Sequence, residues 1–312
     1  MNFLQAFLRA FRIPNLVMVW ITIYLPYWYI LRPAILDGGG IPMLTVPVFN
    51  LMGAATVITT LAGYVLNDWF DRDIDMINKP GRVFWGKYLS SGTALLFYAI
   101  LVTSVHVMAV FIDQALNQAS HWPLWLFPGV SFLLFIYAWK LKCTPVAGNL
   151  LVSFLCALVP VIVMLPEERA RLITGFNAPE LMESAESLVW IYSFFAFLFN
   201  YLREQVKDLE DFSGDAACGC NTLAVIKGRT FARKPAVITG VLVTALTGVL
   251  IRYWAETSAP LWQIQAGAAA LLLPALAVTV LLGFARTSAH YAYASALIKI
   301  IMFSGTILLI RF

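Results

Sequence analysis

Residues 46–82 read VPVFNLMGAATVITTLAGYVLNDWFDRDIDMINKPGR. The apolar run over 46–66 leads directly into four aspartates, Asp68, Asp71, Asp73 and Asp75. A run of about 20 apolar residues has the length of a helix that crosses a membrane. The stretch therefore predicts a transmembrane helix that presents carboxylates where it leaves the lipid.

The composition extends this prediction to the whole chain. Of its 312 residues, 61% are hydrophobic and 12% are charged, about half the charged fraction of a soluble domain. Because backbone polar groups in lipid must be satisfied internally, each apolar run is expected to be a helix. We predict an all-helical membrane protein, one domain over 1–312, with about nine spans. They are 14–34, 46–66, 92–112, 122–139, 146–166, 187–205, 234–254, 261–284 and 291–310.

The distribution of Lys and Arg predicts the orientation. Of the 21 such residues, 15 lie at the N-terminus or in loops after even-numbered spans, five lie on the other side, and Lys299 lies within a span. Cytoplasmic loops of membrane proteins carry an excess of Lys and Arg. We therefore expect the N-terminus and the aspartate-rich loops to be cytoplasmic, in a bacterial or archaeal plasma membrane.

Two acidic stripes share one spacing. On a helix that continues beyond Leu66, the carboxylates at 68, 71 and 75 fall on one face, and Asp73 points elsewhere. After the sixth span the spacing recurs in Asp208, Asp211 and Asp215, with Glu204 one turn earlier. Stacked like charges destabilise a helix, and a bound cation relieves the repulsion.

The chemistry of these residue types indicates a metal and a phosphate. Carboxylate oxygens suit Mg²⁺, which is commonly shared between a few carboxylates and substrate phosphates. A single D-x-x-D is weak and is more often a solvated loop, whereas two matched stripes on one side favour a site. Nearby cations suited to neutralise a diphosphate are Arg72, Lys79, Arg82, Lys140, Lys142, Arg203 and Lys207.

The four cysteines give a weaker signal. Cys143, Cys156, Cys218 and Cys220 form no C-x-x-C pair and have no nearby histidine. Such spacing favours small apolar core residues over a metal or redox site, and shows no disulfide framework.

With both stripes in view, the sequence resembles the UbiA superfamily of intramembrane prenyltransferases. NDWFDRDIDMINKPGR at 67–82 fits that family's first motif, N-D-x-x-D-x-x-x-D followed by N-x-P-x-R. REQVKDLEDFSGD at 203–215 fits its second motif, D-x-x-D-x-x-x-D. FRIPNLVM at 11–18 resembles its segment before the first helix, and YAWKLKCTPVAGN at 137–149 its loop after the fourth.

The resemblance implies a helix bundle around a central cavity in which Mg²⁺ holds an isoprenyl diphosphate. The implied metal ligands are Asn67, Asp68, Asp71, Asp75, Asp208, Asp211 and Asp215. Among them, Asp68, Asp71, Asp208 and Asp211 are the expected catalytic residues. The expected diphosphate contacts are Asn67, Arg72, Lys79, Arg82, Tyr137, Lys142, Arg203 and Lys207, and the expected cavity residues are Asn15 and Lys299.

The second motif resembles the branch with digeranylgeranylglyceryl phosphate synthases, homogentisate prenyltransferases and chlorophyll synthases. The expected donor is geranylgeranyl diphosphate or a similar diphosphate, and the leading acceptor is a glycerol-phosphate ether lipid. An aromatic or quinone-precursor acceptor is the alternative. Membrane lipid is an expected partner, and nucleic acid is not. In place of the family's R-P-L-x-S-G the chain has RVFWGKYLSSG at 82–92, so Arg82 and Lys87 match less well than the aspartates.

Two other classes compete with a transferase. A transporter would place its site near the bilayer midplane, whereas both stripes follow the ends of spans. A terpene cyclase on the same scaffold would ionise the diphosphate without a separate acceptor. The roles of Lys299, a costly charge inside the ninth span, and of His106 in the third span stay open.

Overall fold

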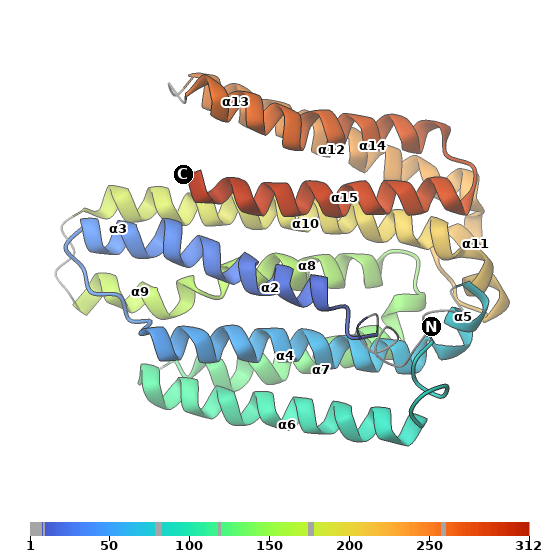
Figure 1. The fold of residues 1–312 in the computed structure, drawn as a ribbon, viewed down its shortest axis with the longest axis horizontal. Helices are drawn as coiled ribbons and strands as arrows, with labels where there is room; N and C mark the ends of the chain where they lie inside the picture. Colours follow the sequence, from blue (N-terminus) through green and yellow to red (C-terminus); the bar gives the residue numbers. More distant parts are fainter. Residues whose placement is uncertain are drawn as a thin grey trace. The chain divides into compact units, whose positions relative to one another are not determined.

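The computed structural model describes residues 8, 10–78, 83–117, 120–173, 178–256 and 260–311, and for 169–173 and 311 it describes the backbone alone (Figure 1). The described chain is almost entirely helical. Its first helices are α2 (Ile13–Leu25), the π-helical turn η1 (Pro26–Leu31), α3 (Arg32–Asp37), α4 (Val46–Phe70), α5 (Arg72–Asn78), α6 (Ser91–Leu116) and α7 (Trp122–Trp139). The later ones are η2 (Leu141–Cys143), α8 (Ala147–Val161), α9 (Met164–Ile173), α10 (Pro179–Ala217), α11 (Leu223–Lys227), α12 (Arg229–Glu256), α13 (Leu261–Gly267), η3 (Ala268–Leu272), α14 (Leu273–Phe284), α15 (Ser288–Leu308) and η4 (Leu309–Arg311).

These helices confirm the predicted fold class. In the described part of the chain, eight helical segments are long and apolar enough to cross a membrane. The fifth predicted span corresponds to α8, which is apolar but only 15 residues long. Each of the nine predicted ranges therefore coincides with a helix, and the largest difference is in α10, which begins and ends well outside its predicted range.

Prolines change the local geometry of two spans without ending them. Pro26 opens η1, and the first span continues through α3 to Asp37. Pro274 lies near the start of α14, directly after the second π-helical turn, η3. Because proline lacks the N–H that an α-helix requires, local π-helical adjustment is a common way to keep such a helix continuous.

One compact unit comprises Met1–Lys142 and Leu158–Ser193. Within it, α4 lies alongside both α6 and α7, and α2 packs on α4 (Figure 1). A small aromatic core joins Phe11, Phe84 and Trp85 to α6, with the rings of Phe11 and Phe97 in edge contact at 5.6 Å between centroids. This core fixes the segment that follows the first aspartate motif.

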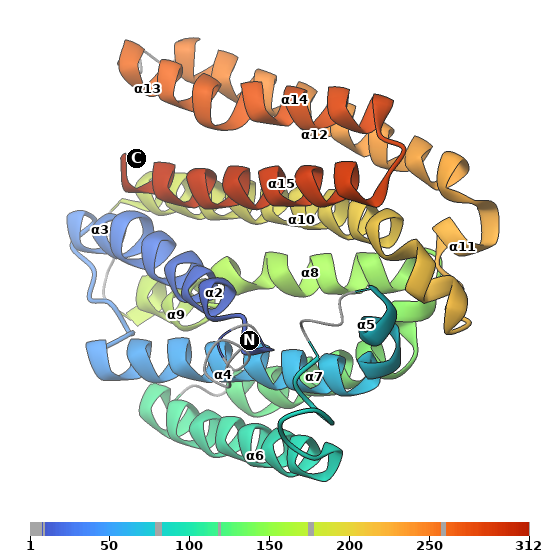
Figure 2. The same ribbon diagram turned by 45° about the vertical axis from the view of Figure 1, so that its right-hand side comes forward.

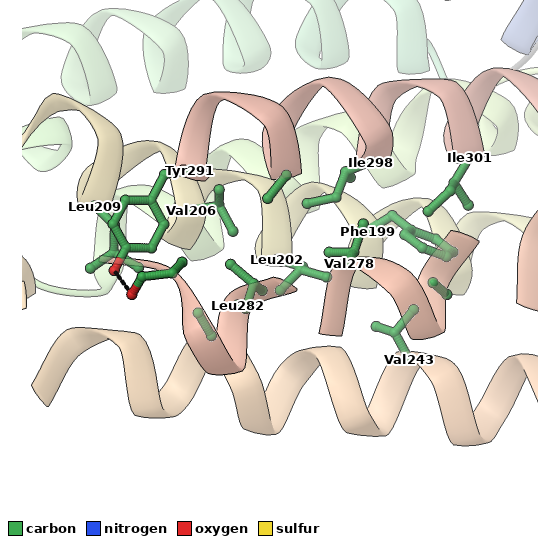
Figure 3. Close-up of a cluster of buried hydrophobic side chains, with 14 of the residues drawn as sticks. Phe199, Leu202, Val206, Leu209, Val243, Val278, Leu282, Tyr291, Ile298 and Ile301 are labelled. Atoms are coloured by element: carbon green, nitrogen blue, oxygen red, sulfur yellow. Dashed lines mark hydrogen bonds between the residues drawn. The ribbon is translucent and has the colours of Figure 1, made fainter. Parts of the chain in front are cut away.

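The other compact unit comprises Cys143–Ala157 and Phe194–Phe312, so the boundary between the units falls inside α8 and α10. Here α14 packs against both α12 and α15 (Figure 2). Figure 3 shows the core of this unit, where Leu202 and Val206 of α10 meet Val278 of α14 and Ile298 of α15. This packing fixes the half of α10 that carries the second motif. The single domain predicted over 1–312 stays a prediction.

Candidate functional site

The first aspartate motif lies where α4 passes into α5. Asp71 caps α4, and its backbone N–H donates to the Asn67 carbonyl at 2.9 Å, while the N–H of Asp75 donates to the Asp71 carbonyl at 2.8 Å. The helical spacing therefore continues across the junction, as the sequence predicted. The Asp73 side chain is 68% exposed, against 13% for Asp68 and 7% for Asp71, so Asp73 is directed away from the other two.

Asp71 is held by two donors. The amide of Asn67, one turn earlier, donates to Asp71 Oδ2 at 2.6 Å. The ammonium of Lys142, which follows α7, forms an ion pair with the same oxygen. Asn67 and Lys142, both predicted to contact the diphosphate, thus contact Asp71, a predicted metal ligand.

Asp68 is paired with Arg12, a residue that the sequence analysis did not assign to the site. The Arg12 guanidinium also stacks on the Tyr64 ring at 4.6 Å from its centroid. Although burial disfavours the charged guanidinium, Asp68 and, to a lesser extent, Tyr64, Asp75 and Tyr137 raise the pKa of Arg12. The predicted cavity residue Asn15 belongs to the same group, since its Nδ2 donates to the Tyr64 hydroxyl at 3.4 Å.

A small pocket opens beside this motif. Its lining residues are Asp68, Arg72, Asp75, Val83, Phe84 and Trp85. Gly86 supports this arrangement, because its φ of 85° suits glycine and a Cβ there would lie 3.2 Å from Arg72 Cδ. The departure from the family pattern at 82–92 therefore builds an aromatic wall of the pocket. Lys79 and Arg82, two predicted diphosphate contacts, lie outside the described residues.

The second aspartate motif occupies the last turns of α10. Asp215 is buried, whereas Asp208 and Asp211 are half-buried. Asp208 Oδ2 accepts a hydrogen bond at 2.8 Å from the amide of Asn149, which comes from α8.

The cations near this motif are arranged differently from those near the first. Arg203 donates to Glu204 Oε1 at 2.6 Å, and its Nε is buried with no hydrogen-bond partner in the described structure. Lys207, which takes the sequence position corresponding to Asn67, is half-buried.

One covalent link corrects the sequence analysis. Cys143 and Cys220 form a disulfide, although the cysteine spacing gave no sign of one. They are 77 residues apart in the chain, yet folding brings their Cα atoms to 4.6 Å, within the range that a disulfide spans. Cys156 and Cys218 are free thiols. The bond ties the segment before α8 to the segment after α10, within one unit.

The sequence left open the roles of Lys299, an expected cavity residue, and of His106. Lys299 is on the exposed side of α15, and His106 is half-buried in α6. Neither position identifies a ligand or a reaction for these residues.

The donor set fits Mg²⁺ as a shared ligand. Among the residues that the structure describes, no three His, Cys, Asp or Glu side chains converge closely enough to hold a metal by themselves. However, the carboxylates of Asp68 and Asp75 line one pocket, and hard oxygen ligands are those that Mg²⁺ prefers. Mg²⁺ commonly completes its coordination with substrate phosphates and water, and the aspartates supply the protein part of such a set.

Residues 23–311 match the UbiA prenyltransferase family. The chain belongs to this family. Digeranylgeranylglyceryl phosphate synthase of Methanothermobacter thermautotrophicus is 33% identical over 189 residues, which cover 58% of this chain and 57% of that protein. The protein of the same name from Thermococcus kodakarensis is 32% identical over 216 residues, covering 69% and 68%. The chain thus spans between about half and two thirds of the length of these UbiA relatives.

Solved structures show the same fold. A structure described as digeranylgeranylglyceryl phosphate synthase superimposes with a TM-score of 0.61 at 21% identity, covering 100% of both chains. The apo structure of a UbiA homologue from Aeropyrum pernix K1 gives a TM-score of 0.58 at 18% identity, covering 93% of this chain and 97% of that one. With its apolar helices, this UbiA chain is an integral membrane protein.

Proposed function

We propose that the protein transfers a polyprenyl group from an isoprenyl diphosphate to a lipophilic acceptor, with Mg²⁺ as the metal. The observation that carries the proposal is the pairing of Asp68 with Arg12 and of Asp71 with Lys142. A carboxylate beside a cation is the combination that a magnesium diphosphate requires, because its oxygens need both Mg²⁺ and positively charged donors. Membership of the UbiA prenyltransferase family supports the same reaction.

We divide the site residues into metal ligands and diphosphate contacts. In this proposal Asn67, Asp68, Asp71, Asp75, Asp208, Asp211 and Asp215 hold the metal. Arg72, Lys79, Arg82, Tyr137, Lys142, Arg203 and Lys207 contact the diphosphate. Bound Mg²⁺ would neutralise the charge that develops on the leaving pyrophosphate. Lys142 would exchange its contact with Asp71 for a phosphate oxygen, which leaves Asp71 available to the metal.

The reaction is an ionisation followed by capture. The allylic C–O bond breaks and its electron pair leaves with pyrophosphate. A nucleophilic oxygen or carbon of the acceptor then bonds to C1 of the prenyl group and loses a proton. The apolar environment of a helix bundle keeps water from the allylic cation, and aromatic faces stabilise a cation electrostatically.

For the acceptor we propose geranylgeranylglyceryl phosphate, with geranylgeranyl diphosphate as the donor. Relatives named digeranylgeranylglyceryl phosphate synthase support this choice, at 31–33% identity in three archaea. We further propose that both motifs face the cytoplasm of a bacterial or archaeal cell. The 15-to-five bias of Lys and Arg supports this orientation.

The test uses the purified protein in lipid nanodiscs with geranylgeranyl diphosphate and Mg²⁺. Separate reactions contain geranylgeranylglyceryl phosphate, an aromatic acid or no acceptor, and products are identified by mass spectrometry. We expect an ether-lipid product and acceptor-dependent release of pyrophosphate. A prenylated aromatic product would favour the quinone-precursor alternative, and a cyclic product without acceptor would indicate a terpene cyclase. Release of no pyrophosphate under any condition would refute the proposal.

A further inference from the structure

Each aspartate motif accepts a hydrogen bond from an asparagine amide, but at a different carboxylate and from a different helix. In the first motif the Asn67 amide donates to Asp71 at 2.6 Å from one turn away on α4. In the second motif the corresponding position is Lys207, which has no amide. The second motif has an amide from α8, where Asn149 Nδ2 donates at 2.8 Å to Oδ2 of Asp208, the counterpart of Asp68 rather than of Asp71.

The Asn149 amide is held in place from several sides. Its side chain is buried, and the backbone carbonyl of Asn149 accepts a hydrogen bond from Ser153 Oγ at 2.6 Å within α8. The segment before α8 is tied to the end of α10 by the Cys143–Cys220 disulfide and by the Asn221 N–H, which donates to the Cys143 carbonyl at 3.0 Å. These links hold the start of α8 close to the end of α10, and this places the Asn149 amide within hydrogen-bond distance of Asp208.

A neutral donor has a specific chemical consequence here. An amide N–H occupies one lone-pair direction of Oδ2, leaves Oδ1 open to a cation and adds no positive charge beside the carboxylate. A lysine or arginine in the same place would neutralise that charge. Groups behind a metal ligand set its orientation, and their loss typically costs 10- to 100-fold in metal affinity or activity.

We propose that Asn149 is a positioning residue that orients the Asp208 carboxylate toward the Mg²⁺ of the bound diphosphate. The inference rests on the proposed function, since it assigns Asp208 to the metal. It adds a residue from α8, outside both aspartate motifs, to the groups that determine how tightly the metal is held. Asn149 itself touches neither the metal nor the diphosphate in this account.

The test measures metal binding without turnover. The full-length protein in nanodiscs is titrated with Mn²⁺ in the presence of inorganic pyrophosphate, and free Mn²⁺ is followed by electron paramagnetic resonance. Asn149→Ala should weaken Mn²⁺ binding about 10- to 100-fold. Asn149→Leu, which keeps a similar volume without the donor, should weaken it equally and serves if the alanine variant does not fold.

Asn200 provides a matched control. It is also a buried asparagine of the same unit, but its Nδ2 donates to the backbone carbonyl of Ala196 at 2.8 Å. Asn200→Ala should change Mn²⁺ binding by less than about twofold, outside the range expected for a group behind a metal ligand. Equal losses in Asn149→Ala and Asn200→Ala would overturn the proposal, as would wild-type binding in both Asn149 variants.

An exchange of the two groups separates positioning from packing. Asn149→Asp combined with Asp208→Asn keeps one amide and one carboxylate in contact but moves the carboxylate onto α8. We expect this double variant to retain the wild-type melting temperature and to lose Mn²⁺ affinity as Asp208→Asn alone does. Recovery of wild-type affinity would show that only the contact matters and would overturn the proposal.

The titration also distinguishes the two levels of inference. A wild-type protein that binds Mn²⁺ with pyrophosphate but prenylates no acceptor would refute the proposed function, while the variants would still decide the role of Asn149. A wild-type protein that transfers prenyl groups and whose Asn149 variants bind Mn²⁺ normally would refute the positioning role alone. Absence of any pyrophosphate-dependent Mn²⁺ binding would refute the positioning role as well.

Discussion

The two aspartate motifs share a spacing but not a way of holding their carboxylates. In the first motif, Asp68 and Asp71 are each paired with a cation from another segment, Arg12 and Lys142. In the second, Asp208 is held by the neutral amide of Asn149. Aspartates with the same spacing can therefore be paired with a cation in one motif and with a neutral amide in the other. We infer that Lys142 leaves Asp71 for the diphosphate, whereas the Asn149 amide stays on Asp208 when the metal binds.

The largest effect is expected from removing a carboxylate. Asp208→Asn and Asp71→Asn should each lower kcat/KM for prenyl transfer by about 100-fold or more, because a metal contributes several kcal/mol of charge stabilisation in the transition state. Asp73→Asn should change the rate by less than about twofold, since its side chain is 68% exposed and directed away. A loss in Asp73→Asn equal to the others would break the one-face assignment. The readout is product formation under saturating Mg²⁺.

A smaller effect is expected at the cations of the first motif. Lys142→Gln keeps a donor to Asp71 but removes the charge, and should raise KM for the isoprenyl diphosphate about 10- to 100-fold, as expected for a charge-assisted hydrogen bond. Steady-state kinetics with varied diphosphate measures this. Lys227→Gln, an exposed lysine of α11, is the control and should leave KM unchanged. An unchanged KM in Lys142→Gln would mean that Lys142 only balances Asp71.

The helical spans were predictable because an apolar segment in lipid must satisfy its backbone hydrogen bonds internally, which an α-helix does. The i, i+3, i+7 spacing likewise foretold that Asp73 would be directed away from Asp68 and Asp71. Periodicity does not show which segments pack side by side, so Arg12 and Asn149 were not assigned. Arg12 precedes the first span and is far in sequence from Asp68, and the hydrogen bond of Asn149 depends on the start of α8 lying beside the end of α10. The Cys143–Cys220 bond was missed for the same reason.

Both cysteines of the disulfide lie in the unit that carries the second motif, so removing the bond tests how that unit is held together. Cys143→Ser with Cys220→Ser should lower the melting temperature of the purified protein. The chain-entropy estimate sets an upper limit of about 4.5 kcal/mol for the 77-residue separation. Cys218→Ser, which removes an exposed free thiol, should leave the melting temperature unchanged. Equal melting temperatures for the disulfide variant and the wild type would show that the Cys143–Cys220 bond does not stabilise the fold.

The smallest effect concerns a buried carboxylate far in sequence from both motifs. Glu167 of α9 is fully buried and accepts hydrogen bonds from the backbone of Met43 at 2.8 Å and of Leu44 at 2.9 Å. Burial raises the pKa of Glu167 above its ordinary value of 4.5, although these donors and Tyr27 oppose the shift. The native state therefore retains this proton to higher pH than the unfolded state does.

It follows that the Glu167 contribution to stability is complete below pH 4.5 and is lost as pH rises through the raised native pKa. The melting temperature of the wild type should therefore fall as pH rises through this range. In Glu167→Gln, where the side chain does not titrate, this fall should be absent. The dependence of prenyl transfer on Mg²⁺ should be the same in both proteins. A changed Mg²⁺ dependence in Glu167→Gln would mean that this carboxylate is not purely structural.

We propose that both motifs hold one magnesium diphosphate, and a double-mutant cycle on geranylgeranyl transfer measures the coupling between them. Asp71→Glu and Asp208→Glu each keep the charge and displace it, and kcat/KM is measured for both single variants and for the double variant. Residues that act as a unit are strongly non-additive. We expect the loss of kcat/KM in the double variant to be much smaller than the product of the two single losses. A loss equal to that product would show two independent sites and contradict the proposal.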